Sequence, residues 1–265
     1  MVNKFRLTNS TPVATPMVTG ATFLTADSPS TPMQVVRMHR IPYAEVIGSV
    51  LWPVIVSQPD AAFAVSTLLQ FIQNPRPTHW EALECMIVFL GSMKDLWLIF
   101  SRQSKLATEG FCDADWGGQK HHHSISSYSF HMGARAISWS LKKQHIVALS
   151  STKAEYITQM HTAKEVLWLH SFLQELLSTP DDPLILNCDN QGASTLAKDN
   201  KFHACTKHID MHYHFIREVV EDGKVAVQYI LTGDNVSNIF TKPLAKAKFQ
   251  ELTELLGLCA ITCKV

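Results

Sequence analysis

The chain has 265 residues, of which 46% are hydrophobic, so it is long enough to bury a substantial core. Lys and Arg together number 23, as do Asp and Glu, so no overall positive field marks a polyanionic partner and any nucleic-acid surface must be local. The six cysteines show no C-x-x-C pair and no disulfide-framework spacing, and no signal peptide is evident. This pattern predicts buried thiols in an intracellular protein, cytoplasmic or nuclear and not secreted. The longest apolar stretch, "VIGSVLWPVIV", is too short to span a bilayer, so we expect no membrane partner.

The first hundred residues divide into two parts. Residues 1–38 are rich in Thr, Pro and Ser without a sustained period, which predicts a mostly irregular leader. From Tyr43 to Met93, within the segment 39–100, the apolar positions recur at helical spacing, with breaks at "SQPD" and "QNPRPTHW". We therefore expect two or three helices in this segment.

The sequence pattern changes after residue 95, where runs of strand-forming residues alternate with turns. The runs are "LWLIF", "GFCDADW", "SYSFHM", "RAISWS" and "LILNCD", with "HMGARA" as a hairpin turn. The longest predicted helix covers 152–177. A second helix is predicted for "NQGASTLAKD" and a third for "TKHIDMHYHFIREVVEDG", where Gly223 would end the third. The run "VAVQYI" is predicted to be a strand. Meandering strands followed by crossover helices predict a mixed sheet with helices packed on it.

Three acidic residues stand at the ends of elements where the sheet and a crossover helix would converge. Asp113 follows the strand "EGFC", Asp189 ends "LILNC", and Glu155 lies in the first turn of the long helix. If the two strands are adjacent and parallel, their carboxyl ends open onto one crevice. Grouped carboxylates repel one another unless a cation intervenes, and hard oxygen ligands suit Mg²⁺ or Mn²⁺ rather than zinc.

Each acid also has a purely structural interpretation. Glu155 completes a T-x-x-E capping box with Thr152, so its side chain would then satisfy a backbone N–H. Asp189 would serve as the N-cap of the following helix. The role of Asp115, on the same strand face as Asp113, stays open.

Several motifs in order resemble the RNase H domain that ends the Pol polyprotein of copia-type LTR retrotransposons. They are "GFCDADWGG", "AISWSLKKQHIVALSSTKAEY", "VLWLHSFLQELL", "LNCDNQGASTLAKD", "TKHIDMHYHFIREVVEDGKV" and "NIFTKPL", and they cover about 105–258. The region upstream, from "YAEVIGSV" to "LGSMKD", resembles the segment between polymerase and RNase H in that family. The resemblance implies an α/β fold: an RNase H-like mixed five-stranded sheet flanked by helices and preceded by a small helical segment. The expected organisation is a 1–38 leader, a 39–100 polymerase-connection remnant, a 105–258 RNase H-like domain and a 259–265 tail.

The resemblance also implies an activity and the residues that carry it. The family's metal-binding acids fall on Asp113, Glu155 and Asp189, which would hold two Mg²⁺ or Mn²⁺ ions and hydrolyse the RNA strand of an RNA–DNA hybrid. Asp113 would bridge both ions. The order Asp, Glu, Asp disfavours an integrase, whose Glu comes last. The chain has no Y-x-D-D motif, so the rest of a Pol polyprotein would be its partner in polymerisation.

The chain departs from the family at the last catalytic position. Where the family carries Asp in "ADI(L/F)TKPL", this chain has Asn238 in "SNIFTKPL". A neutral amide removes a charge, so the second ion should be held more weakly. The alternative function is therefore a catalytically silent fragment that keeps the fold and weak nucleic-acid binding.

The segment "HACTKHIDMHYH" raises a different possibility, because His208 and His212 have the i, i+4 spacing of helical zinc ligands. The absence of a second Cys pair argues against zinc. Lys207, His208 and Arg217 are instead assigned to a phosphate backbone, with solvent as the alternative.

Overall fold

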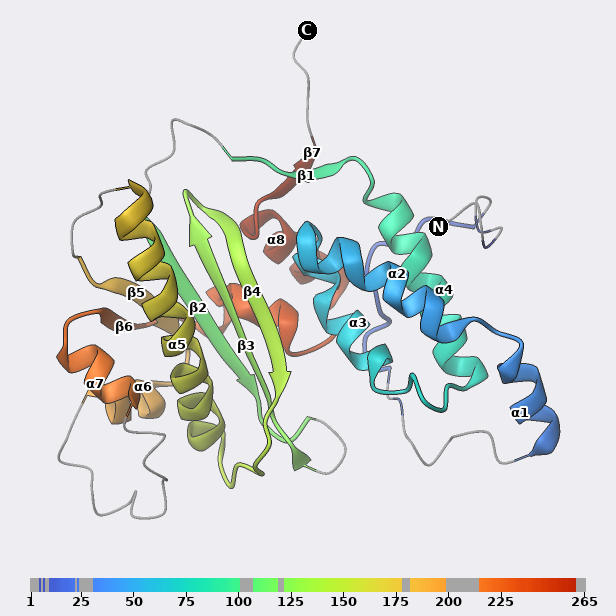
Figure 1. Cartoon of the computed structure of the whole chain (residues 1–265), viewed down its shortest axis with the longest axis horizontal. Coiled ribbons are helices and arrows are strands. Elements are labelled where there is room, and N and C mark those ends of the chain that lie inside the picture. The colour runs from blue at the N-terminus through green and yellow to red at the C-terminus, as the bar shows by residue number, and fades with distance from the viewer. Residues whose placement is uncertain are drawn as a thin grey trace, which may run out of the picture. The chain divides into compact units, whose positions relative to one another are not determined.

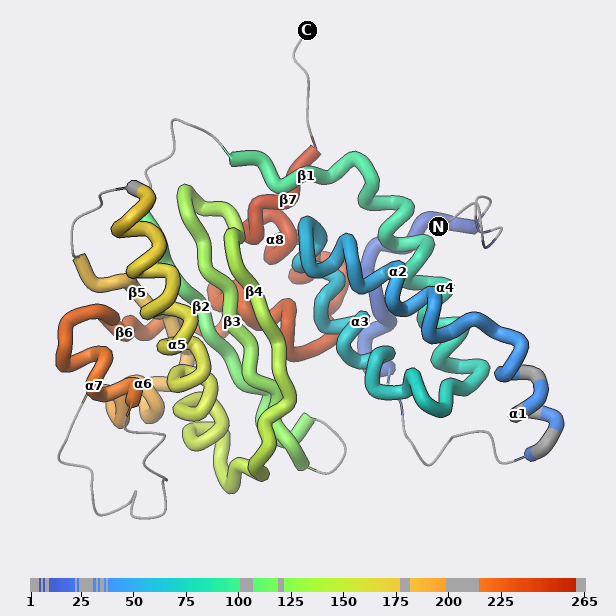
Figure 2. Tube along the Cα trace, viewed as in Figure 1, coloured from blue at the N-terminus to red at the C-terminus, as the bar shows by residue number. Residues whose placement is uncertain are grey.

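The computed structural model describes residues 5, 7, 10–21, 23, 31–100, 107–118, 122–177, 182–198 and 215–260 (Figure 2). Contacts divide the chain into two units, one formed by Met1–Ile99 with Lys242–Val265 and the other by Phe100–Thr241. The segment from Lys242 onward thus groups with the first unit, whereas the sequence-based limits place it with the sheet up to 258. The domain limits themselves stay a prediction.

Helices build the first unit. They are α1 (Pro32–His39), α2 (Tyr43–Val56), the 3₁₀ helix η2 (Pro59–Ala61), α3 (Ala62–Leu69), α4 (Pro77–Ser92) and α8 (Lys246–Leu255). The Tyr43 hydroxyl donates to the Leu68 carbonyl over 2.8 Å and so ties the start of α2 to the end of α3. The small helical segment expected before the sheet is confirmed.

The C-terminal segment joins this unit through apolar packing and strand pairing. Phe249 of α8 lies edge-on to Phe89 of α4, with ring centroids 5.7 Å apart, and Leu252 is fully buried. Strand β7 (Leu258–Ala260) pairs antiparallel with β1 (Leu96–Leu98) in a separate two-stranded sheet. These contacts are the physical reason why α8 and β7 separate from the five-stranded sheet.

The described part of the leader is less irregular and better packed than its composition suggests. Helix α1 begins at Pro32, inside the segment expected to be irregular. The ring of Phe23 lies edge-on to Phe71 and to His79, at centroid distances of 6.2 and 5.4 Å, and Met17 is buried. Aromatic contacts therefore anchor a segment whose composition predicted little packing.

A mixed five-stranded sheet forms the centre of the second unit, as the sequence predicted. Its strands are β2 (Thr108–Asp115), β3 (Ile125–Met132), β4 (Arg135–Lys143), β5 (Leu184–Cys188) and β6 (Val225–Tyr229), in the order β4-β3-β2-β5-β6 (Figure 1). The first three strands pair antiparallel, while β5 is parallel to both β2 and β6. The β3–β4 hairpin turns at Gly133 and Ala134, both with positive φ, as "HMGARA" predicted.

Helices α5 (Ser151–Leu177), α6 (Gln191–Lys198) and α7 (Phe215–Glu221) flank this sheet (Figure 1). Apolar residues of α5, among them Tyr156, Ala163 and Val166, form one buried cluster with Phe130 and Leu186 of the strands. Residues 206–214 of the helix expected over 206–223 lie outside the described residues; the described part ends at Glu221, and Gly223 follows with φ +70°.

Tight packing in this cluster explains why a glycine, Gly110, stands on β2. A Cβ placed on Gly110 of β2 would lie 2.6 Å from the Phe130 ring, so a larger residue there would displace a fully buried side chain. Glycine at this position lets β2 and β3 pack under α5.

The second face of the sheet carries the 3₁₀ helix η7 (Val236–Phe240). Neighbouring β3 residues point to opposite faces: Ser126 accepts a hydrogen bond from Thr158 of α5, whereas Ser127 donates to the Ser237 carbonyl of η7. Helix α5 and η7 therefore cover opposite faces of the sheet. None of the helices in the described ranges is long and apolar enough to cross a membrane.

Candidate metal centre

Three carboxylates meet where β2 and β5 end. Cys112 and Cys188 are paired in register on these parallel strands, so the residues that follow them, Asp113 and Asp189, lie at the same edge. The first turns of α5 bring Glu155 to this edge. One carboxylate oxygen from each acid lies within 4.8 Å of the others. The parallel pairing thus brings together the three acids selected from the sequence.

Glu155 reaches across to the strand instead of capping its own helix. Its Oε1 accepts a hydrogen bond from the Ala114 backbone N–H over 3.2 Å, and its Oε2 is buried without a hydrogen-bond partner in the described part of the chain. The Ser150 hydroxyl caps the first turn of α5 by accepting a hydrogen bond from the Lys153 backbone N–H. The capping-box interpretation of Glu155 is therefore not the arrangement found.

Electrostatics at Glu155 oppose its charged form when no cation is present. Burial raises the pKa of the Glu155 carboxyl well above its ordinary range, and the charges of Asp113 and Asp189 raise it further. The Ala114 N–H acts in the opposite direction by stabilising the carboxylate. An unpartnered buried oxygen beside two other carboxylates is an arrangement that a divalent cation would complete.

Asp189 likewise does not act as the N-cap of α6, the structural role considered for it. The neighbouring Asn190 caps α6, since its Oδ1 accepts from the Ala193 N–H over 2.9 Å. Asp115 ends β2 beyond the cluster, and its carboxylate occupies the space beside Gly118.

The Asp113 side chain has a partner that sequence reasoning missed. The Thr241 hydroxyl donates to Asp113 Oδ2 over 2.5 Å, and both residues are buried. The signal was available in "NIFTKPL", where Thr241 follows three residues after Asn238, but nothing local shows that it reaches a strand 128 residues away.

A pair of thiols lies directly before the acids. The Cys112 and Cys188 Sγ atoms are 2.9 Å apart and fully buried, and burial raises the pKa of the Cys112 thiol. The expectation of buried thiols holds for this pair, whereas Cys85 is exposed and Cys259 is partly exposed.

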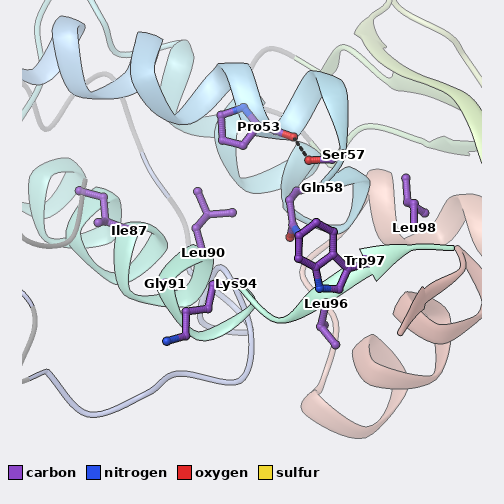
Figure 3. A pocket seen from close by; sticks show the side chains of 10 residues that line it. All are labelled: Pro53, Ser57, Gln58, Ile87, Leu90, Gly91, Lys94, Leu96, Trp97 and Leu98. Atoms are coloured by element: carbon purple, nitrogen blue, oxygen red, sulfur yellow. Dashed lines mark hydrogen bonds between the residues drawn. The ribbon is translucent and has the colours of Figure 1, made fainter. Parts of the chain in front are cut away.

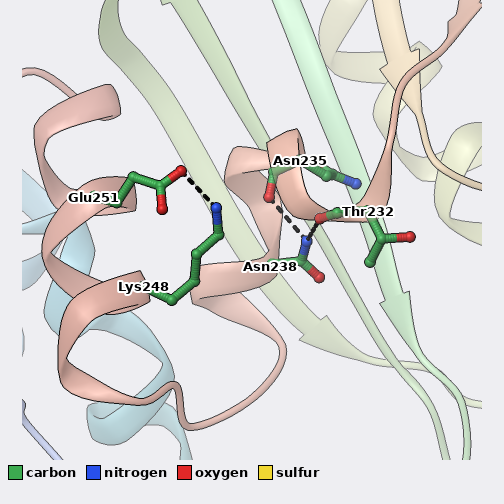
Figure 4. A network of polar contacts seen from close by, with 5 residues as sticks. All are labelled: Thr232, Asn235, Asn238, Lys248 and Glu251. Atoms are coloured by element: carbon green, nitrogen blue, oxygen red, sulfur yellow. Dashed lines mark hydrogen bonds and ion pairs between the residues drawn. The ribbon is translucent and has the colours of Figure 1, made fainter.

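The Asn238 amide is turned into its own loop. Its Nδ2 donates to the Thr232 and Asn235 carbonyls over 2.5 and 3.0 Å (Figure 4). Its Oδ1 is buried and has no hydrogen-bond partner within the described ranges. An aspartate could make neither of these donated bonds, so the amide has a structural role here.

The residues assigned to a phosphate backbone are only partly described. Lys207 and His208 lie outside the described residues, as does the segment with zinc-like spacing. Arg217 is 4% exposed; its Nε donates to the Leu196 carbonyl over 2.8 Å, and its guanidinium lies 5.8 Å from the centroid of the Tyr156 ring. Arg217 thus ties α7 to α6, which differs from the exposed position expected of a phosphate ligand.

A separate pocket of about 380 Å³ lies in the first unit (Figure 3). Trp97 and Lys94 line it together with apolar side chains of α2, α4 and β1. Lys94 is the ionisable group among its lining residues, so the pocket offers no set of groups for acid–base chemistry or for holding a cation.

Comparison with known proteins gives relatives of one kind over nearly the whole chain. The "Retrovirus-related Pol polyprotein from transposon TNT 1-94" of Nicotiana tabacum is 36% identical over 97% of this chain and 19% of its own length. That from transposon RE2 of Arabidopsis thaliana is 33% identical over 94% of this chain and 17% of its own length. The chain therefore spans less than a fifth of these relatives.

Other comparisons are shorter or weaker. The "Secreted RxLR effector protein 161" of Plasmopara viticola is 38% identical over 50% of this chain and 94% of its own length. A solved structure, the N-terminal RNase H domain from Mycobacterium tuberculosis fused to maltose-binding protein, is 10% identical, with a TM-score of 0.37 over 57% of this chain and 98% of that one. The strand order β4-β3-β2-β5-β6 defines the fold of the second unit. No protein-family profile matches the chain.

Proposed function

Because this chain belongs to the Pol polyproteins of copia-type retrotransposons, we propose that its RNase H-like domain hydrolyses the RNA strand of RNA–DNA hybrids. One observation carries the proposal: Asp113, Glu155 and Asp189 place carboxylate oxygens within 4.8 Å of one another. Three such groups in a partly buried site repel one another, and the usual way to hold them together is a shared divalent cation.

The donor set fits Mg²⁺ or Mn²⁺. All three candidate ligands are carboxylates, and Glu155 Oε2 is buried without a partner among the described residues. Two bound ions would activate a water molecule and stabilise the leaving oxygen. Asp113, the central acid in this proposal, would contribute to both ion sites, with Glu155 and Asp189 completing them.

The protein itself fixes these acids in place. The parallel pairing of β2 and β5 sets the separation of Asp113 and Asp189, and the Ala114 N–H orients the Glu155 carboxylate. Such a preformed arrangement loses little entropy when a cation binds. The proposed partners are an RNA–DNA hybrid and the rest of a Pol polyprotein, and the proposed location is the cytoplasm or nucleus.

Asn238 favours a second candidate function, a catalytically silent domain that retains the fold and binds nucleic acid weakly. The neutral amide supplies one charge fewer than the family's aspartate, and its NH₂ group is engaged with two backbone carbonyls (Figure 4). We propose that the second ion is therefore held more weakly than the first, which lowers activity.

The deciding experiment follows cleavage of end-labelled RNA, either annealed to DNA or single-stranded, with MgCl₂ or MnCl₂. The wild-type chain should cut only the hybrid, and Asp113→Asn should abolish cutting. Asp115→Asn is the matched control, because it makes the same change on the same strand outside the carboxylate cluster.

Three outcomes are distinct. Hybrid-specific cleavage that depends on Asp113 but not on Asp115 supports the nuclease. Hybrid binding without cleavage, in a protein with an intact fold, supports the silent domain. Cleavage that survives Asp113→Asn refutes this assignment of the site.

A further inference from the structure

The segment that follows strand β6 is fastened to the strand that carries Asp113. Asn235 Nδ2 donates to the Cys112 carbonyl and Ser237 Oγ donates to the Phe111 carbonyl, both over 2.8 Å. The Ser127 hydroxyl of β3 lies 3.2 Å from both the Ser237 carbonyl and the Asp113 carbonyl, and it can donate its proton to either. Asn235 and Ser237 are fully buried, so water does not compete for these bonds. The segment therefore holds a fixed position against β2.

Thr241 is the residue that ends this fastened segment, as the C-cap of η7. It is 1% exposed, and its hydroxyl has two possible acceptors: Asp113 Oδ2 at 2.5 Å and the Asn238 carbonyl at 3.3 Å. A hydroxyl has one proton to donate. The nearer acceptor, Asp113 Oδ2, takes it, because a hydrogen bond weakens as the donor–acceptor distance increases.

This bond restrains the rotation of the Asp113 carboxylate. An aspartate side chain at a strand end rotates about χ1 and χ2 unless a partner fixes it, and χ2 has a broad distribution. The Thr241 hydroxyl bonds to Oδ2 of the same carboxylate that belongs to the cluster with Glu155 and Asp189.

We propose that Thr241 is a positioning residue of the metal centre: its hydroxyl holds the Asp113 carboxylate in the orientation from which it binds a divalent ion. The inference rests on the proposed function, since it assigns a role toward the same three acids. It goes beyond that function by including a neutral residue of another element in the site. Hydrogen-bond partners of metal-binding carboxylates commonly affect metal affinity about 10–100-fold.

The test measures MnCl₂ binding by isothermal titration calorimetry, with the full chain and no nucleic acid. Thr241→Val keeps the side-chain shape but removes the hydroxyl, and it should weaken Mn²⁺ binding about 10-fold. Thr241→Ser keeps the hydroxyl and should bind Mn²⁺ like the wild type. If the valine variant does not fold, Thr241→Ala removes the same hydroxyl without placing a methyl group against the carboxylate.

Thr162→Val is the matched control. Thr162 is also fully buried in the second unit, but its hydroxyl donates to the Thr158 carbonyl within α5. Its loss should lower stability without changing Mn²⁺ affinity. Wild-type affinity in Thr241→Val, equal losses in Thr241→Ser and Thr241→Val, or an equal loss in Thr162→Val would each overturn the positioning role.

The same titration separates this inference from the nuclease proposal. A wild-type chain that binds Mn²⁺ but leaves hybrids intact would refute the nuclease, while the Thr241 variants would still decide the positioning role. A wild-type chain that binds no Mn²⁺ would overturn both.

Discussion

Replacing Glu155 by glutamine should make the metal-free protein more stable and remove its stabilisation by divalent cations. Glu155 is 5% exposed and lies close to two other carboxylates. Glutamine removes the charge, keeps an oxygen that can accept from the Ala114 N–H, and places an NH₂ group where Asp113 or Asp189 can accept from it. The substitution therefore removes repulsion without leaving a gap.

The pH dependence of this effect follows from the raised pKa of Glu155. A carboxyl whose pKa is higher in the folded than in the unfolded state contributes stability below the unfolded value of about 4.5 and loses it as pH rises through the folded value. Each unit of increase is worth about 1.4 kcal/mol. For a chain of this size, 1.4 kcal/mol corresponds to a change in Tm of about 3–6 °C. Glu155→Gln should thus raise the metal-free Tm at pH values above the folded pKa of Glu155 and have little effect below about pH 4.5.

Circular dichroism melts in EDTA and in saturating MgCl₂ provide the measurement. The wild type should gain about 2.7 kcal/mol when Mg²⁺ is present at 100 times its Kd, whereas Glu155→Gln should gain far less. Glu165→Gln is the control, because Glu165 lies on the same helix and accepts from Ser138 away from the cluster. A Glu155→Gln protein that melts with the wild type in EDTA, or that still gains the full Mg²⁺ stabilisation, would refute the reasoning.

Four further substitutions test the packing around this site and in the first unit. Asn238→Asp removes two donated bonds and should lower metal-free stability by about 1–3 kcal/mol in urea titrations, with Mg²⁺ restoring part of the loss; unchanged stability would contradict the loop geometry. Phe23→Ala should cost about 1–2 kcal/mol of unfolding free energy, whereas Val18→Ala, at an exposed leader position, should cost almost nothing; equal effects would show that the leader is not anchored. Burial lowers the pKa of His79 to about 4, so the free energy of unfolding should fall as pH drops from about 6.5 to 4. His79→Gln should remove about 3 kcal/mol of that loss. An unchanged pH profile in this variant would show that His79 is not the cause of the loss. Arg217→Lys breaks the bond to the Leu196 carbonyl and should reduce stability by about 1–3 kcal/mol while hybrid affinity stays the same; weaker hybrid binding at full stability would restore Arg217 to the nucleic-acid surface.

Much of the site could be predicted because its determinants are local. Asp113 and Asp189 directly follow strand-forming runs, and Glu155 lies one turn into a long helix signal. If the two strands are adjacent and parallel, these positions converge at one sheet edge, and the structure shows that pairing. The mixed sheet and the preceding helices followed from the same local patterns, whereas the number of five strands followed from the resemblance to the RNase H domain.

The sequence left open whether two of the acids cap helices, and in the structure neighbouring residues make these caps. Glu155 and Asp189 both had plausible capping roles, but Ser150 and Asn190 make the caps instead. A short polar residue adjacent to a helix start can cap it equally well, so sequence spacing alone does not select among such neighbours.

By itself, the sequence determined the acids, their order along the chain and the strands that present them, because strand and helix periodicity depend on residues close in sequence. Only the tertiary structure decided that Thr241 bonds to Asp113 and that Arg217 is buried against Tyr156. It also decided that Phe23 anchors the leader and that α8 packs with the first unit. These are contacts between residues far apart in the chain. They form only when helices and strands pack together, and no local sequence pattern specifies which side chains then meet.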